Sequence, residues 1–150
     1  MTVDLEESAR KLLEVVPIIM QAIRSEMRSR RSLDLTVPQF RALAFVNRNE
    51  GSSLWEVARH MGLTPPSTSR LVDGLIARGL MARNDHPADR RRVRLTVTGQ
   101  GLTILEASTE GTASYLADKL SGVDADNREV IDKAVETLRA VFAPAHELER

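Results

Sequence analysis

At 150 residues the chain is long enough for one domain with a buried core, or for one domain with helical extensions. It contains no cysteine, which excludes disulfides, cysteine-ligated zinc, thiol redox sensing and cysteine nucleophiles. No apolar run approaches the ~20 residues of a membrane span, and the acidic residues near the start are unlike a signal peptide, so we expect a cytoplasmic protein without a membrane segment.

The charge of the chain is unevenly distributed, although its formal net charge is zero. Residues 59–94 carry 8 Arg and 3 Asp, a net charge of +5, whereas residues 95–150 carry 5 basic and 10 acidic residues, a net charge of −5. Arginine is suited to bidentate contacts with phosphate and with base edges. The positive charge of residues 59–94 therefore indicates binding to nucleic acid, although a basic segment is also often a plain solvated face.

Residues 4–30 are predicted to form an amphipathic helix, because apolar side chains recur at helical spacing from Leu5 to Met27. Pro17 lies inside this helix and predicts a kink or a break near Val16. Two interpretations stay open, since the apolar face can pack on its own domain or on a second copy of the chain.

Two short helices are predicted from their capping boxes, one beginning after Thr36 (with Gln39) and one after Ser53 (with Glu56). Gly62 ends the second helix, and only one residue separates it from the next N-cap, Thr64. Short helices joined by a tight turn with glycine are typical of a helix-turn-helix, although helical bundles that bind no DNA also contain them.

The helix from Pro65 to about residue 78 has two different sides. At about 100° per residue, its buried side is defined by apolar residues, namely Leu71, Val72, Leu75 and Ile76, and Thr68 lies on that side. Pro66, Arg70, Asp73 and Ala77 point outward, with Ser67 and Ser69 on the flanks. A small, hydroxylated surface suits close approach to a DNA groove, with Arg70 able to reach a guanine edge or a phosphate.

Two details of this helix predict its electrostatics. Thr64 as N-cap and Pro65 at the first position are expected to leave the first N–H groups free to face an anion. Asp73 would repel phosphate, so we expect it to pair with Arg70 or with an arginine of the ribbon that follows.

Gly79 ends this helix, and two strands are predicted at Leu80–Asn84 and Arg92–Val97, joined by a turn-rich loop over residues 85–91. The second strand alternates apolar residues inward with polar residues outward. A helix-turn-helix followed directly by a basic hairpin is a winged helix, and this combination is far more specific than either part.

The C-terminal third is predicted to be helical, with Thr98 capping one helix whose sparse apolar stripe is interrupted at Gly111, and a last helix from about Ala125 to Phe142. Helices beyond those of the winged unit are best explained by a partner chain, so we expect a homodimer. The predicted class is mainly α (α+β). Its parts are an N-terminal dimerisation helix (1–35), a winged helix-turn-helix with a two- to three-stranded wing sheet (36–98) and C-terminal dimerisation helices (99–150).

The chain resembles the MarR family, the multiple-antibiotic-resistance type of winged-helix regulator. The resemblance covers about the whole chain, and its motifs are Leu54-Trp-Glu-Val-Ala, Leu63-Thr, Ser69-Arg-Leu-Val-Asp73, Leu75, Arg78-Gly-Leu80, Asp89-Arg-Arg and Leu95-Thr-Val-Thr-Gly. The resemblance implies a homodimer that binds pseudo-palindromic double-stranded DNA and usually represses. It also implies release by a small aromatic or phenolic effector bound between the dimer helices and the winged unit.

The resemblance also assigns roles to residues. It places Ser67, Ser69 and Arg70 in the major groove and Arg91 in the minor groove, whereas Pro65-Pro66 departs from the polar residues common there. The full set of expected DNA-binding residues is Thr64, Pro65, Pro66, Ser67, Ser69, Arg70, Arg90, Arg91 and Arg92, with Asp73 and Asp89 bracing the wing.

Other classes of function have little support in the sequence. His60, His86 and His146 are too scattered for a metal site, we expect no cofactor, and no glycine-rich phosphate loop or nucleophile elbow indicates an enzyme. The alternative to a DNA-binding regulator is a winged-helix module for protein–protein interaction, whose arginines meet an acidic partner. A ligand cavity formed by residues including Met20, Ile23, Met27 and Phe40 is a further hypothesis, although such a stripe is more often simply core.

Overall fold

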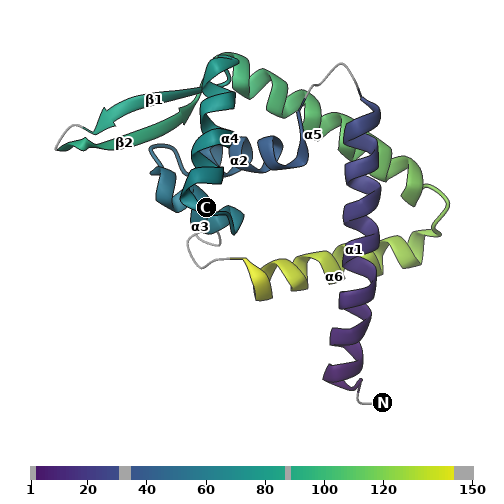
Figure 1. Ribbon diagram of the computed structural model, residues 1–150. Helices are drawn as coiled ribbons and strands as arrows, with labels where there is room; N and C mark the ends of the chain where they lie inside the picture. Colours follow the sequence, from purple (N-terminus) through teal and green to yellow (C-terminus); the bar gives the residue numbers. More distant parts are fainter. Residues whose placement is uncertain (1–2, 31–34, 87–88, 144–150) are drawn as a thin grey trace. The chain divides into compact units, whose positions relative to one another are not determined.

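The computed structural model describes residues 3–30, 35–86 and 89–143, and for residues 86 and 89–92 it describes the backbone. Its elements, in chain order, are α1 (Leu5–Ser29), α2 (Val37–Arg48), α3 (Leu54–Met61), α4 (Pro65–Ala77), β1 (Met81–His86), β2 (Asp89–Val97), α5 (Gly99–Leu120) and α6 (Ala125–Phe142) (Figure 1). The chain divides into two compact units, Met1–Thr112 and Ala113–Arg150. Across the described ranges, none of the helices combines the length and the apolar character needed to cross a membrane.

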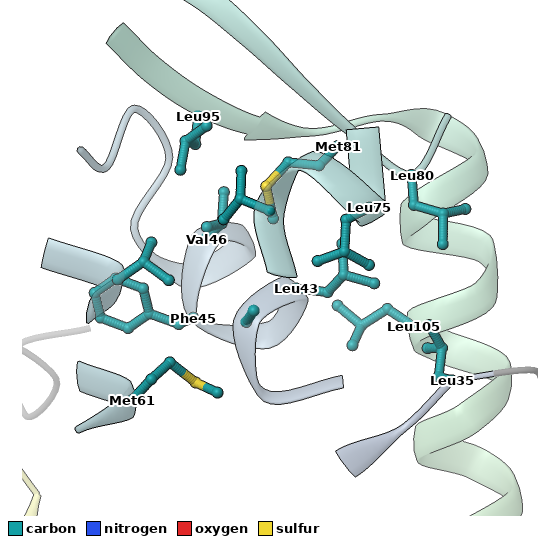
Figure 2. Close-up of a cluster of buried hydrophobic side chains, with 13 residues drawn as sticks. Leu35, Leu43, Phe45, Val46, Met61, Leu75, Leu80, Met81, Leu95 and Leu105 are labelled. Atoms are coloured by element: carbon teal, nitrogen blue, oxygen red, sulfur yellow. The ribbon is translucent and has the colours of Figure 1, made fainter. Parts of the chain in front are cut away.

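The core of the first unit is an apolar cluster contributed by α2, α3, α4, the start of β1, β2 and the first half of α5 (Figure 2). Its fully buried side chains include Leu43, Leu75, Leu80, Met81 and Leu95. Burying one such side chain stabilises the fold by about 1.5–3 kcal/mol, so this cluster fixes the helices against the hairpin. The predicted buried side of α4 is confirmed by this packing.

The helix boundaries follow from local hydrogen bonds. Both predicted capping boxes are present. The side chains of Thr36 and Ser53 each accept the backbone N–H of the residue three positions on, and their own backbone N–H groups donate to the side chains of Gln39 and Glu56. Gly62 ends α3 in the left-handed conformation, at φ 66°, which glycine adopts without strain. The predicted helix-turn-helix is confirmed.

The hairpin pairs β1 with β2 in antiparallel register, from Met81 opposite Val97 to Asp85 opposite Val93. Gly51 and Leu95 are joined by a backbone hydrogen bond of 2.9 Å, and Ser52 and Leu95 form an isolated bridge, so a third segment lines the base of the hairpin. Figure 1 shows the hairpin projecting away from the helices of the first unit. This arrangement agrees with the predicted two- to three-stranded sheet.

The predicted loop over residues 85–91 is too long. β1 continues to His86, β2 begins at Asp89, and the register shifts so that His86 lies opposite Asp89. Asp85 and His86 are neighbours on β1, but their partners on β2, Val93 and Asp89, are separated by three residues, Arg90 to Arg92. Extra residues of this kind form a bulge that bends and twists a strand, which explains why pairing continues where turn-forming residues predicted a loop.

Two predicted irregularities of the long helices do not interrupt them. α1 is continuous from Leu5 to Ser29 with Pro17 inside it, because a proline removes one hydrogen bond while the neighbouring ones persist. α5 is likewise continuous through Gly111. A Cβ atom at Gly111 would lie 1.7 Å from the Arg30 guanidinium, so this glycine makes room for a side chain from the end of α1.

The second unit contains α6, whose predicted bounds agree with the structure. Asp124 is its N-cap and accepts the backbone N–H of Asn127 at 2.9 Å. None of the residues of α6 is buried, and Val141 and Phe142 are among its most exposed apolar side chains.

Candidate nucleic-acid interface

The N-terminus of α4 is closed by its own side chains. Thr64 Oγ1 accepts the backbone N–H of Ser67 at 3.3 Å and donates to Ser67 Oγ at 3.0 Å. Pro65 and Pro66, at the first two helical positions, have no N–H. The expectation that this end offers free N–H groups to an anion is therefore wrong, and contacts with a ligand fall to side chains.

The two sides of α4 are placed as the angular prediction requires. Thr68 is fully buried and its hydroxyl donates to the carbonyl of Thr64 at 2.9 Å, which confirms that it faces the core. Thr64, Pro65, Pro66 and Arg70 are exposed, and Ser67 and Ser69 are partly exposed. The outward surface of the first two turns is thus small and hydroxylated, with one cation.

Asp73 is held by the hairpin. Its Oδ1 lies 2.8 Å from Nη2 of Arg83 on β1, and its Oδ2 accepts a hydrogen bond of 3.4 Å from Ser69. Of the two predicted partners, the ribbon arginine is confirmed. Arg83 itself was not among the predicted site residues, although its place in the strand after α4 and its charge opposite to that of Asp73 were visible signals.

The tip of the hairpin carries the remaining predicted residues. Arg90, Arg91 and Arg92 lie on β2 beside the register shift, as described above, and Asp89 is the first residue of that strand. Their side chains lie outside the described part of the structure. The backbone thus places these four residues at the far end of the hairpin.

A groove runs along the side of α4. It is lined by Trp55 from the first turn of α3, by Ser69 of α4, and by Arg83 and Arg94 of the hairpin. The side chain of Arg94 lies over Gly51, with Cδ 3.7 Å from the position of a Cβ atom there. Sequence reasoning predicted only Ser69 of these residues, because the others come together only when the hairpin folds back on α3.

A second pocket lies between the C-terminal half of α1 and the start of α2. It is lined by four arginines (Arg24, Arg28, Arg30 and Arg41) together with Met27, Leu35, Thr36, Val37 and Pro38. Of the cavity residues hypothesised from the sequence, Met27 lines this pocket, whereas Met20, Ile23 and Phe40 do not.

The described residues include no group of three or more His, Asp and Glu side chains placed to hold a metal ion. His60 instead stacks on the ring of Phe45, with the centroids 4.3 Å apart.

These elements define the class of the protein. A helix-turn-helix followed by a basic hairpin is a winged-helix fold, and it agrees with solved structures. The chain superposes on the Mycobacterium tuberculosis protein RV1404 with a TM-score of 0.79, at 21% identity and with 94% and 95% of the two chains covered. It superposes on a mutant of MarR from E. coli with a TM-score of 0.78, at 19% identity and with 92% and 98% covered.

Sequence comparisons find similar proteins. Residues 33–92 match the model of the MarR family. An uncharacterized HTH-type transcriptional regulator of Mycobacterium bovis is 23% identical over 137 residues, which cover 91% of this chain and 96% of the relative. The uncharacterized HTH-type transcriptional regulator YhbI of Bacillus subtilis is 29% identical over 105 residues, covering 70% and 68%. Residues 33–92 are thus similar to the MarR family, and both relatives are named as HTH-type transcriptional regulators.

Proposed function

We propose that the protein is a dimeric repressor that binds a pseudo-palindromic operator and is released by a small effector. Residues 65–78 enter the major groove and residues 84–92 contact phosphates and the adjacent minor groove. The observation that carries this proposal is the ion pair between Asp73 and Arg83, which joins the exposed face of α4 to the hairpin. A recognition helix and a wing must keep a fixed separation to contact neighbouring grooves at once.

The outward face of α4 supports a division of labour between helix and wing. Arg70 is its one cation that can bond a guanine edge or a phosphate, and the two prolines beside it donate nothing. The arginines at 90–92 therefore supply most of the affinity, through phosphate contacts that depend on salt. Bound in this way, the helix selects the site and the wing strengthens the complex.

The dimer is supported by apolar side chains that a single chain leaves exposed. Leu5, Leu13 and Val16 of α1 are 85%, 75% and 48% exposed. On α6, Val135 is 48% and Phe142 is 72% exposed. Two helices with uncovered apolar faces suit a partner copy, so residues 1–35 and 99–150 serve dimerisation while residues 36–98 bind DNA. A dimer places its two recognition helices about one helical turn, ~34 Å, apart on the operator.

The pocket between α1 and α2 is the candidate effector site. Arg24, Arg28 and Arg41 favour an anion, whereas Arg30 is already paired with Glu26. Met27, Leu35 and Pro38 offer an apolar surface, so the pocket suits an ionised phenol or aromatic acid. Since the pocket joins a proposed dimer helix to the first helix of the winged unit, a ligand there is placed to change the spacing of the two recognition helices.

A gel shift tests the proposal directly. DNA flanking the protein's own gene is titrated with protein beside a scrambled duplex of equal composition, and the titration is repeated with a panel of aromatic acids and phenols. We expect preferential binding of the flanking DNA and its release by at least one compound. Equal binding of both duplexes would contradict the operator and favour the alternative, a protein-binding winged helix.

A further inference from the structure

Trp55 is the only tryptophan of the chain and it lies in the first turn of α3 with 63% of its surface exposed. The guanidinium carbon of Arg59, one helical turn further on, lies 5.4 Å from the centre of its ring. A cation this close to an indole face is held by the ring's negative potential. Trp55 and Arg59 thus form one structural element, a stacked pair of side chains on the outer face of α3.

This element is not needed for the packing of α3. The buried residues of the helix are Val57, Ala58 and Met61, which lie on the opposite side. Among the described residues, none accepts a hydrogen bond from the Trp55 indole N–H, and none forms an ion pair with Arg59. Both side chains therefore keep donors available for a ligand.

The carboxylates nearby are already engaged. Glu56 accepts the backbone N–H of Ser53 at 3.0 Å as part of the capping box, and Asp73 pairs with Arg83. Neither carboxylate forms an ion pair with Arg59, so the charge of Arg59 is left to act on an approaching anion.

The position of the element connects it to the proposed DNA-binding surface. Trp55 lines the same groove as Ser69 of α4 and Arg83 of the hairpin. In a helix-turn-helix the first helix crosses the sugar–phosphate backbone while the second enters the major groove. The groove is therefore continuous with the surface that would face DNA.

We propose that Trp55 and Arg59 bind a backbone phosphate of the operator beside the recognition helix. The indole N–H and the guanidinium each donate to phosphate oxygens, and the stacked ring holds the guanidinium in position. The inference rests on the proposed DNA binding, and it adds a contact on α3 to those of α4 and the wing. A charge-assisted contact of this kind positions the protein without reading sequence.

The single tryptophan provides a direct reporter, measured on the full-length protein. Operator duplex is added while Trp55 emission and its quenching by neutral acrylamide are followed. We expect the emission to change and the quenching to fall with the same saturation curve as the gel shift. A duplex that shifts the protein in the gel but leaves Trp55 equally accessible overturns the proposal while the proposed function stands.

Variants separate the two donors by anisotropy of labelled operator at several salt concentrations. Arg59→Ala is expected to lower affinity about tenfold and to reduce the slope of log K against log salt by about one. Trp55→Phe keeps a ring beneath the guanidinium and loses only the N–H, so it should weaken binding less than Trp55→Ala. Lys133→Ala, which removes an exposed charge from α6, is the matched control and should change neither quantity.

Thermal unfolding of each variant checks the fold, because exposed side chains should leave it unchanged. If Arg59→Ala and Trp55→Ala bind like the parent with an unchanged salt slope, the pair makes no phosphate contact and Trp55 belongs to another surface, such as a protein contact. If the parent itself fails to bind any duplex, the proposed function fails and this contact fails with it.

Discussion

Arg83 of β1 and Asp73 of α4 are joined by an ion pair of 2.8 Å that fixes the hairpin against the helix beside it. The two side chains are 43% and 59% exposed, so solvent screens the pair and it contributes at most about 1 kcal/mol to stability. We therefore expect the pair to orient the hairpin relative to α4 rather than to stabilise the fold. It also neutralises the Asp73 carboxylate, which lies next to a proposed phosphate contact.

Breaking this pair should reduce discrimination between DNA sequences more than stability. Asp73→Ala removes a charge that repels phosphate, so it should raise the affinity for scrambled DNA. The affinity for the operator should stay unchanged. Arg83→Ala should weaken binding to both. Anisotropy with operator and scrambled duplexes gives the ratio of the two affinities for each variant and for the double variant. An unchanged ratio in both single variants would show that the pair plays no part in orientation.

Replacing glycine by alanine should destabilise the fold at Gly101 and stabilise it at Gly74. A Cβ at Gly101 would lie 1.9 Å from the carbonyl oxygen of Leu80, so Gly101→Ala should destabilise the fold by at least about 1–3 kcal/mol. Gly74, inside α4, has open space at that position, and Gly74→Ala should stabilise the fold by about 1 kcal/mol. Urea unfolding of both variants at one fixed protein concentration measures the difference. Full stability of Gly101→Ala would contradict the close packing of α5 on Leu80, and destabilisation by Gly74→Ala would contradict the open space at that position of α4.

Local patterns in the sequence predicted the elements that local chemistry determines. The capping residues Thr36 and Ser53, the stop at Gly62 and the bounds of α6 follow from hydrogen bonds and spacing within a few residues. The inward position of Thr68 follows from helical geometry alone. These features depend on no distant part of the chain, so they could be predicted from the sequence alone.

Features that need two distant segments were missed. The contact of Arg30 with Gly111 joins residues 81 positions apart, and the groove at Trp55 exists only because the hairpin folds back on α3. The extent of the hairpin was also missed, since Asp85 and Asp89 were predicted to lie in a loop, whereas both residues pair in the sheet. Spacing along the chain carries no information on which long side chain fills a gap left by a glycine.

Removing Arg91 should weaken binding chiefly at sites with A·T-rich flanks, because a narrow minor groove has the most negative potential. Arg91→Ala is expected to reduce the slope of log K against log salt by about one. Lys133→Ala provides an equal loss of charge far along the sequence. Anisotropy on operators with A·T-rich and G·C-rich flanks, at several salt concentrations, measures both effects. Binding by Arg91→Ala that matches the parent on every duplex would contradict the role of the wing.

The start of α6 should respond to acid through Asp124. The backbone N–H of Asn127, then its side-chain amide, donates to this carboxylate and lowers the pKa of Asp124 below its ordinary value. A lowered pKa means that the cap stabilises the helix fully above the ordinary pKa and loses this effect as the pH falls through the lowered one. Asp124→Asn keeps an N-cap acceptor but cannot titrate. Amide exchange of the first turn of α6, followed between about pH 5 and pH 2, should depend on pH less in this variant than in the parent. An equal pH dependence would place the titrating group elsewhere.

A charge placed on the apolar face of α6 should dissociate the proposed dimer. Val135 is 48% exposed in the single chain, and a glutamate at this position would be buried unpaired between two copies. Val135→Glu should raise the dimer dissociation constant at least about a hundredfold, because an unpaired buried charge costs several kcal/mol. Lys133→Glu, two residues away on the outward face, alters the charge more and should leave the dimer intact. Sedimentation velocity across a concentration series measures both variants, and operator binding by Val135→Glu should weaken in parallel because each monomer offers a single recognition helix. Dissociation by Lys133→Glu alone would place the interface on the opposite face of α6.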